Sequence, residues 1–404
     1  MDTKNQAKRH NNGPGLVEET SQLFLNGLRR YKSESPLSIP IPLIVAVGNI
    51  MVCLMVTGGI VNYTKTDWVQ LCINLIFIPV SVMVGTMILR FKRSFSWVNK
   101  EIDSWWSYKL LGKETDVMKK NAAEWMAWYG QYYYIGMYLA WVMNLVPFIK
   151  CHIWGKSEDP MNNLMYPCWT PLDLGTWWGF VLTYMFQFMS MYLSYFTFGN
   201  TCFYLTTAYI SIGYQAQLIG LAILSVEQRC RKLSDENKDS SKREEIYESY
   251  VKEEIKSCIK HYQQLQRSAK ELSNIFSTLA VLSYNIGIVV LSISGIRLTT
   301  ETDKLMLVNS FVNTCVTLGN QFIISFICEL LTEEVEKLRK IIYYSSWVSM
   351  PVSCQKYIYT FLMMVDYMPT PVTLTGLKTN YENFSKVVNS AYCYFSLILS
   401  MRNK

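Results

Sequence analysis

The sequence predicts an all-α polytopic membrane protein with seven transmembrane helices, a cytosolic N-terminus, an extracellular C-terminus and a cytosolic helical anchor region. Half of the 404 residues are hydrophobic and only 17% are charged, whereas a soluble domain carries roughly 25% charged residues. The uncharged residues come in long blocks, which is the pattern of membrane-spanning helices. The Lys and Arg residues lie mostly between the blocks, and their distribution predicts the orientation.

Seven apolar blocks are the predicted spans, and they follow a polar segment, residues 1–38, that we interpret as a cytosolic tail. No cleavable signal peptide is predicted there. Pro40 and Pro42 open the first span, where proline is tolerated because its missing N–H donor would have no partner at a helix start. The spans are predicted at Ile41–Val61, Trp68–Leu89, Ala127–Phe148, Trp177–Phe198, Leu272–Ile296, Leu305–Cys328 and Phe384–Ser400.

The fourth span is the ambiguous one. No charged residue occurs between Asp173 and Glu227, so this segment is long enough for two spans, at Trp177–Phe198 and Cys202–Ser225. The second half is the more polar, and a second span would move the basic loop 227–270 to the outside. We therefore predict one span that continues as a long helix beyond the membrane.

The charge distribution favours a cytosolic N-terminus. With seven spans in this orientation, 30 of the 38 Lys and Arg residues lie inside and 7 lie outside, as the excess of positive charge on the cytoplasmic side of membrane proteins requires. Asn62-Tyr63-Thr64 is a glycosylation sequon in the first outside loop, so we predict that Asn62 is glycosylated. A second sequon, at Asn383, falls on the cytosolic side and should stay unmodified.

The remaining polar segments define the domain organisation. Loop 227–270 carries both charge signs and is predicted to be a solvated, helix-rich loop. After the sixth span come a charged helix, Thr332–Lys340, and an apolar piece, Tyr357–Val365, which at nine residues is too short to span a bilayer. The predicted parts are the tail 1–38, the six-span region 39–330 with its cytosolic loop, the cytosolic anchor segment 331–382 and the seventh helix 383–404.

Composition and motifs argue against an enzyme, a cofactor and a metal site. The three histidines, His10, His152 and His261, are far apart in the sequence, and no hydrolase, nucleotide-binding or metalloprotease motif occurs. The net charge of +7 does not indicate nucleic-acid binding, because the basic residues are spread over the loops. Most of the 11 cysteines are expected to be buried thiols. Cys151 and Cys168 share one outer loop, and the sequence leaves open whether they pair.

The seventh span is unusually polar. Ser385, Asn389, Cys393, Ser396 and Ser400 recur at steps of four and three, so they share one face of a helix. In a bilayer this face must contact protein or water, because hydrocarbon offers no hydrogen bonds. Two interpretations stay open from these residues alone: helix packing through small side chains, or the lining of a water-filled path.

Motifs in the last quarter of the chain resemble those of the insect odorant receptors. They are Ile342-Tyr343-Tyr344-Ser345-Ser346-Trp347, Thr373-Leu374-Thr375-Gly376, and Phe384 and Val388 followed by Ser390-Ala391-Tyr392-Cys393-Tyr394-Phe395 and Leu397. Ile259-Lys260-His261 also resembles a family motif, whereas the basic residue often found before the Pro-containing turn is absent from Val365-Asp366-Tyr367-Met368. The inverted seven-span plan extends the resemblance to the whole chain.

The resemblance implies a ligand-gated, poorly selective cation channel. In this family four subunits surround a central pore lined by the last helix, and cytosolic parts of the late helices hold the subunits together. The loop before the fifth span is short for the shared coreceptor, so the chain resembles a ligand-tuning subunit whose obligate partner is the odorant coreceptor. The implied localisation is the plasma membrane of sensory neurons, in contact with membrane lipid.

The resemblance also implies a gate, which is the aliphatic residue two positions after the Tyr-Phe pair of the last helix. Here that residue is Leu397, and a ring of such side chains can close a pore by dewetting. By its spacing alone, Leu397 fits a position that faces lipid or a neighbouring helix as well as it fits a gate. The predicted pore-lining residues are Asn389, Cys393, Ser396, Leu397 and Ser400.

A small volatile ligand is expected to bind in the outer halves of the spans. Such a ligand needs a largely apolar pocket with few polar groups, and Met adapts its shape to loose recognition. For any single residue, ordinary core packing is the competing interpretation. The candidates are Tyr134, Met137, Tyr138 and Trp141 of the third span, Tyr184, Phe188 and Met189 of the fourth, and Asn309 and Asn313 of the sixth.

Three other classes of membrane protein share part of the pattern. A gustatory receptor has the same plan but ends with a Thr-Tyr…Gln-Phe signature, which Ser390-Ala391-Tyr392 and Ser400-Met401 lack. A G-protein-coupled receptor places its N-terminus outside, against the charge distribution. A transporter would carry charged residues at the bilayer midplane or an internal repeat, and neither is evident. The odorant receptor is therefore the predicted function.

Overall fold

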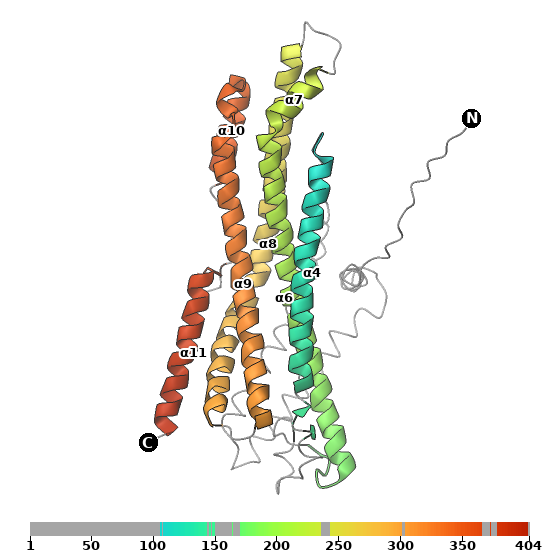
Figure 1. The fold of residues 1–404 in the computed structure, drawn as a ribbon, viewed down its shortest axis with the longest axis vertical. Helices are drawn as coiled ribbons and strands as arrows, with labels where there is room; N and C mark the ends of the chain where they lie inside the picture. The colour runs from blue at the N-terminus through green and yellow to red at the C-terminus, as the bar shows by residue number, and fades with distance from the viewer. Residues whose placement is uncertain are drawn as a thin grey trace, which may run out of the picture.

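The computed structural model of this chain is a bundle of long helices (Figure 1). It describes residues 106, 108–143, 145–146, 148–149, 164, 170–235, 243–300, 304–365, 372 and 378–402. The predicted tail, the first two spans, Asn62, Cys151 and Cys168 lie outside the described residues. Within these ranges the chain is helical apart from short connections and one isolated bridge between Val372 and Lys378. The all-α prediction is confirmed.

The long helices run side by side along the bundle, and two short ones lie at one end, which we call the inner end (Figure 1). α4 and α8 run away from this end, and α6 and α9 run towards it. The elements are α4 (Gly112–Met143), α6 (Trp177–Leu224), α7 (Val226–Asp235), α8 (Arg243–Thr300), α9 (Lys304–Tyr344), the 3-10 turn η4 (Trp347–Ser349), α10 (Val352–Met364) and α11 (Tyr381–Arg402).

Helix α6 is one unbroken helix of 48 residues, as the sequence predicts. At about 1.5 Å per residue it extends over roughly 72 Å, more than twice the thickness of a bilayer core of about 30 Å. Thr176 caps its start by accepting a hydrogen bond from the Gly179 N–H at 3.3 Å. No proline interrupts the segment, so nothing in the backbone stops the helix at the bilayer surface.

Two of the described helical stretches are long and apolar enough to cross a membrane, Cys202–Leu224 and Leu307–Ser349. A third, Ser283–Thr299, is apolar but shorter. The Cys202–Leu224 stretch is 67% buried among the other helices, which is also what the core helix of a water-soluble bundle shows. It covers the half of α6 that the charge distribution predicts to lie inside the cell.

Helices α8 and α9 are longer than the predicted spans. The loop predicted at 227–270 is helical where the structure describes it, but residues 243–270 form one continuous helix of 58 residues with the fifth span. The prediction that this loop is solvated is wrong for one face of the helix, because Val251, Ile255 and Tyr262 are fully buried. The charged segment Thr332–Lys340 is likewise a continuation of α9 rather than a separate helix. A change from apolar to charged side chains does not end a helix, because neither junction contains a proline or a capping glycine.

The inner end of the bundle has a tightly packed core. Ile255 and Tyr262 of α8, Ile219 of α6 and Phe361 of α10 are each fully buried. The rings of Tyr262 and Phe361 meet edge to face with centroids 5.7 Å apart. The short apolar piece predicted near Tyr357–Val365 therefore belongs to a helix buried against α8, as expected.

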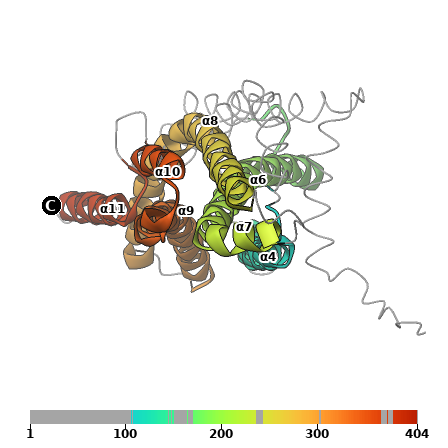
Figure 2. The same cartoon turned by 90° about the horizontal axis from the view of Figure 1, so that it is seen from above.

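Helix α11 lies at the edge of the bundle, on the side away from α4 (Figures 1 and 2). Val387 and Ala391 are its buried apolar residues. The Ser292 hydroxyl of α8 donates a hydrogen bond to the Ala391 carbonyl at 3.0 Å, and a Cβ at Gly295 would lie 3.0 Å from the Phe395 ring. A single narrow face thus holds α11 against α8 and α9, and its other faces are open.

Candidate pore helix and ligand site

The polar residues of α11 lie opposite its buried face. Asn383, Val387 and Ala391 form the buried face, whereas Asn389 and Cys393 are exposed. Ser385 and Ser400 are exposed too, and Ser396 is half-buried. The polar face of α11, which we define as Ser385, Asn389, Cys393, Ser396 and Ser400, therefore points away from the chain's own bundle.

Leu397 is exposed as well. Its side chain keeps 54% of its surface accessible, although its neighbour Phe395 is half-buried beside α8. The Ser400 hydroxyl donates to the Leu397 carbonyl at 2.8 Å, so the backbone around Leu397 is regular. More than half of this side chain is therefore left uncovered by its own bundle. It faces solvent, lipid or another subunit.

Aromatic rings join α4 to the start of α11 through α9. Trp125 of α4 stacks near Phe326 with ring centroids 6.5 Å apart, and Phe326 lies 6.1 Å from Phe322 one turn earlier in α9. Phe322 meets Tyr381 at 6.0 Å and Phe384 at 5.7 Å. These contacts provide a continuous route of packed side chains between α4 and the start of α11.

Three of the predicted ligand-site residues come together between α4 and α6. Trp141 stacks on Phe188 with centroids 4.6 Å apart, and both belong to the same cluster as the fully buried Tyr184. Phe148 lies 5.0 Å from Tyr184 and completes the contact. This cluster lies towards the end of the bundle opposite the inner end. It is the best aromatic candidate for a ligand contact among the described residues.

Tyr138 touches this cluster, with its ring centroid 5.9 Å from that of Trp141, whereas other predicted ligand-site residues lie elsewhere. Tyr134 lies 5.8 Å from the ring of Phe203, and Met137 packs against a second cluster that contains Phe203. The Asn313 amide donates to the Asn309 side chain at 3.0 Å, so these two satisfy each other along α9. The most exposed members of the predicted set are Tyr138, at 66%, and Met189, at 54%.

The predicted residues thus fall into three groups rather than one pocket. Hydropathy alone does not predict which face of a buried helix packs against which neighbour, because all faces of such a helix are apolar. The spacing of Trp141, Tyr184 and Phe188 gave no sign that these three would meet and that Tyr138 and Met189 would point outwards.

A family model described as 7tm odorant receptor matches residues 43–392, which is most of the chain. The chain belongs to the odorant receptor family. It is accordingly a membrane-embedded, multi-pass receptor and not an enzyme. The family inferred from the motifs of the last helix is confirmed.

Solved structures of one insect receptor share the fold. The olfactory receptor OR5 from Machilis hrabei superposes with a TM-score of 0.75 at 11% identity, covering 91% of this chain and 90% of that chain. The same receptor in complex with eugenol superposes with a TM-score of 0.73 at 11% identity, covering 89% of this chain and 88% of that chain. At this identity the likeness is one of fold. No curated protein sequence matches the chain.

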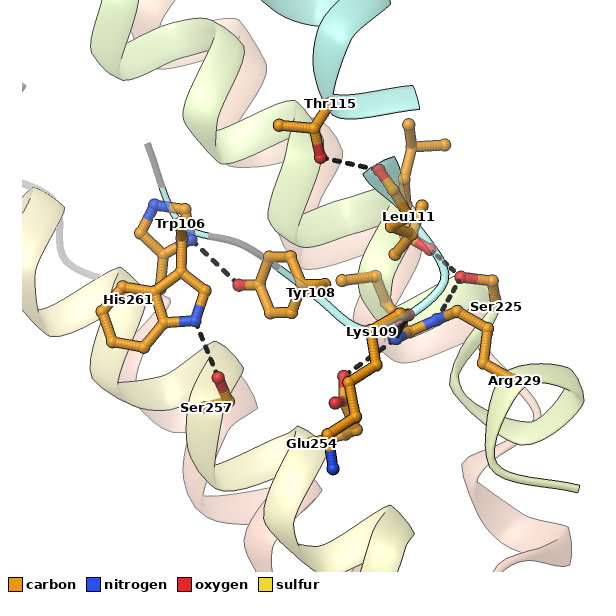
Figure 3. A network of polar contacts seen from close by, with 12 residues as sticks. Trp106, Tyr108, Lys109, Leu111, Thr115, Ser225, Arg229, Glu254, Ser257 and His261 are labelled. Carbon is orange, nitrogen blue, oxygen red and sulfur yellow. Dashed lines mark hydrogen bonds and ion pairs between the residues drawn. The ribbon is translucent and has the colours of Figure 1, made fainter. Parts of the chain in front are cut away.

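At the inner end of the receptor, Arg229 of α7 is the centre of a buried polar network (Figure 3). Its guanidinium donates to the Glu254 carboxylate of α8 at 2.9 Å and to the Lys109 carbonyl at 2.8 Å. It also donates to the Ala222 carbonyl at 2.9 Å and the Ser225 hydroxyl at 3.1 Å. The Arg229 and Glu254 side chains are only 7% and 10% exposed. Arg229 therefore ties the segment before α4 to α6, α7 and α8.

His261 of α8 is the second centre of the network. Its Nδ1 lies 2.9 Å from the Tyr108 hydroxyl and its Nε2 lies 3.0 Å from the Gln215 side-chain oxygen. The Trp106 ring stacks on it at 5.3 Å and donates to the Ser257 hydroxyl at 2.8 Å. Burial lowers the pKa of His261 to about 3. The imidazole is therefore neutral, with Nε2 donating to Gln215 and Nδ1 accepting from Tyr108.

The backbone of this segment is held in an unusual conformation. Leu110 has a φ of 63°, which costs a non-glycine residue of the L series about 1–2 kcal/mol. Its neighbours hold it there, since the Lys109 carbonyl accepts from Arg229 and Leu111 is buried. The network thus fixes the chain as it enters α4.

Sequence reasoning missed this network. Its long-range contacts join residues 25 to 153 positions apart in the chain, and no spacing rule connects residues at such separations. The one signal in the sequence was the resemblance of Ile259-Lys260-His261 to a family motif, which marked His261 without giving its partners.

Replacing Arg229 with Met should destabilise the receptor by about 3–5 kcal/mol, because Glu254 would stay buried without a partner. Thermal unfolding of the purified protein in detergent measures this loss. The double variant Arg229→Met/Glu254→Met should recover much of the stability. Arg231→Met is the control, because the Arg231–Glu227 pair is exposed and should contribute at most about 1 kcal/mol. Equal losses in the two single variants would contradict the prediction.

The stability of the receptor should fall as the pH drops below about 6.5, the ordinary pKa of histidine. His261 has a pKa of about 3 in the folded protein, so between these two values the unfolded chain binds more protons and stability rises with pH. The expected slope approaches 1.4 kcal/mol per pH unit for this one group. Thermal unfolding between pH 7.5 and pH 4.5 tests it. His261→Gln should lack this part of the slope, and an unchanged slope would refute the assignment.

Proposed function

We propose that this chain is a ligand-tuning subunit of an odorant-gated, non-selective cation channel. The odorant coreceptor is its partner in a tetramer, in the plasma membrane of sensory neurons. The observation that carries the proposal is the polar face of α11, which points away from the chain's own bundle. A membrane-spanning helix does not leave such groups to hydrocarbon. The face therefore needs water or another subunit against it.

A central pore meets this requirement. In the orientation that the charge distribution favours, α11 starts at the cytosolic side and ends at the outer mouth of the pore. Asn389 and Cys393 then line the path, and Leu397 near its outer end is the gate. The exposure of Leu397 in the single subunit supports this role, because a gate residue must point into the pore rather than pack within its own subunit. Four such side chains would expel water from a narrow pore.

The ligand is a small organic molecule that binds between α4 and α6, away from the inner end. A receptor of the same fold is described in complex with eugenol. In this chain the cluster of Trp141, Tyr184 and Phe188 offers flat apolar surfaces of the kind that such ligands contact. The binding opens the pore only to the extent that the ligand favours the open state. The ring contacts from Trp125 to Phe384 join α4, the helix that also carries Trp141, to α11 by way of α9.

The inner end is the anchor that holds the subunits together. Tyr344, Val348 and Val352 follow one another around the end of α9 and the start of α10, and each is at least 69% exposed. A group of exposed apolar side chains is typical of a protein contact surface. The short loop between α7 and α8 favours a ligand-tuning subunit, since the coreceptor of this family carries a longer one.

Expression with the coreceptor tests the proposed function. Cells that make both chains should give cation currents with some member of an odorant panel, and cells that make the coreceptor alone should not respond to that odorant. An N-terminal tag should be labelled by antibody only after permeabilisation. Absence of current under every combination, or labelling of intact cells, would refute the channel proposal.

Leu397→Ser should raise the current without odorant several-fold, because a hydroxyl wets the constriction that a ring of leucines keeps dry. Ile398→Ser is the matched control, since Ile398 is also an exposed aliphatic residue of α11 but lies off the polar face. Whole-cell recording, with surface expression measured in parallel, compares the two. An unchanged resting current in the Leu397 variant, or the same rise in both, would show that Leu397 packs against lipid or protein instead.

A further inference from the structure

The polar face of α11 continues towards the cytosol as an ion pair. Glu382 and Lys386 lie one turn apart in the first two turns of the helix, and the Lys386 ammonium is 2.6 Å from the Glu382 carboxylate. From Lys386 the same face continues to Asn389, Cys393 and Ser400, at steps of three, four and seven. The pair therefore lies on the line of residues proposed to face the pore, at its inner end.

The pair has no evident structural task. The Lys386 and Glu382 side chains are 59% and 70% exposed, and exposed pairs of this kind contribute at most about 1 kcal/mol to stability. The opposite face of α11 already provides the packing, through Asn383 and Val387. A lysine near the start of a helix also gains nothing from the helix dipole, which favours negative charge there.

A lysine on the pore face of a cation channel poses a physical problem, and its position beside Glu382 solves it. A lone ammonium at the inner mouth would lower the local concentration of cations. With a carboxylate at 2.6 Å, the two fields largely cancel at the distance of a passing ion. Removal of either charged group leaves the other unpaired, so a single substitution can make the local charge either negative or positive.

We propose that Glu382 and Lys386 line the inner mouth of the pore, and that their ion pair sets the charge that permeating cations meet there. This inference rests on the proposed channel function. The ligands concerned are the permeating monovalent and divalent cations, which gather near unpaired carboxylates and avoid unpaired ammonium groups. Each copy of this chain in the tetramer contributes one such pair.

The test compares charge variants in channels formed with the coreceptor. In excised inside-out patches, the outward single-channel current is carried by cations that enter at the inner mouth. Lys386→Gln leaves Glu382 unpaired and should raise this current about twofold, and Glu382→Gln should lower it about twofold, as expected for one unscreened charge a few ångströms from the ion path. The double variant should return to the wild-type value. All differences should shrink in concentrated salt.

Lys120→Gln is the matched control, because Lys120 and Glu124 of α4 form an exposed pair of the same spacing far from α11. It should leave the single-channel current unchanged. Unaltered currents in both α11 variants, or a change of the same sign in both, would overturn the proposal. Wild-type channels that give no current would instead refute the channel function itself, so the two failures are distinguishable.

A second measurement changes the charge at position 386 after the channel has folded and assembled. In a Cys393→Ser background, Lys386→Cys channels are assembled first and then modified from the cytosolic side. A negatively charged methanethiosulfonate should raise the outward current and a positively charged one should lower it. Equal effects of the two reagents, or none, would place residue 386 outside the ion path.

Discussion

The continuity of α8 is the constraint on which the rest of the structure depends. At one end of this helix Glu254 and His261 hold the buried polar network, and at the other Ser292 bonds to the backbone of α11. Roughly 57 Å separate the first and last of these positions along a straight helix, at about 1.5 Å per residue. A rigid rod of this length makes the core at the inner end and the last helix parts of one body. Any movement of α11 must therefore occur against α8 or together with it.

The attachment of α11 is correspondingly slight. Its contacts with α8 and α9 use one face, where the Phe395 ring packs onto Gly295 of α8 and the Ala391 carbonyl accepts a hydrogen bond from Ser292. At the start of the helix the rings of Tyr381 and Phe384 provide firmer support on α9. The helix is thus fixed near its N-terminus and less firmly held towards its C-terminus.

Much of the fold could be predicted from the sequence, and the site only in part. The hydropathy blocks and charge distribution predicted one long fourth helix, and α6 is that helix. The polar spacing of Asn389 and Cys393 predicted a shared face, which the structure shows to be turned outwards. The meeting of Trp141 with Phe188 could not be predicted, because both helices are apolar on all sides. The Arg229–Glu254 pair could not be predicted either, because charged residues in a polar loop are expected to be solvated.

The outward polar face of α11 also affects the free energy of the subunit in the bilayer before assembly. A subunit inserted alone exposes the Asn389 amide and the Cys393 thiol to its surroundings. In a bilayer each unsatisfied amide or hydroxyl carries a free-energy cost of order 1 kcal/mol or more. The lone chain is therefore higher in free energy than a chain whose polar face is covered. In the assembly that we propose, the supply of partner subunit would limit the amount of this chain that is stably inserted.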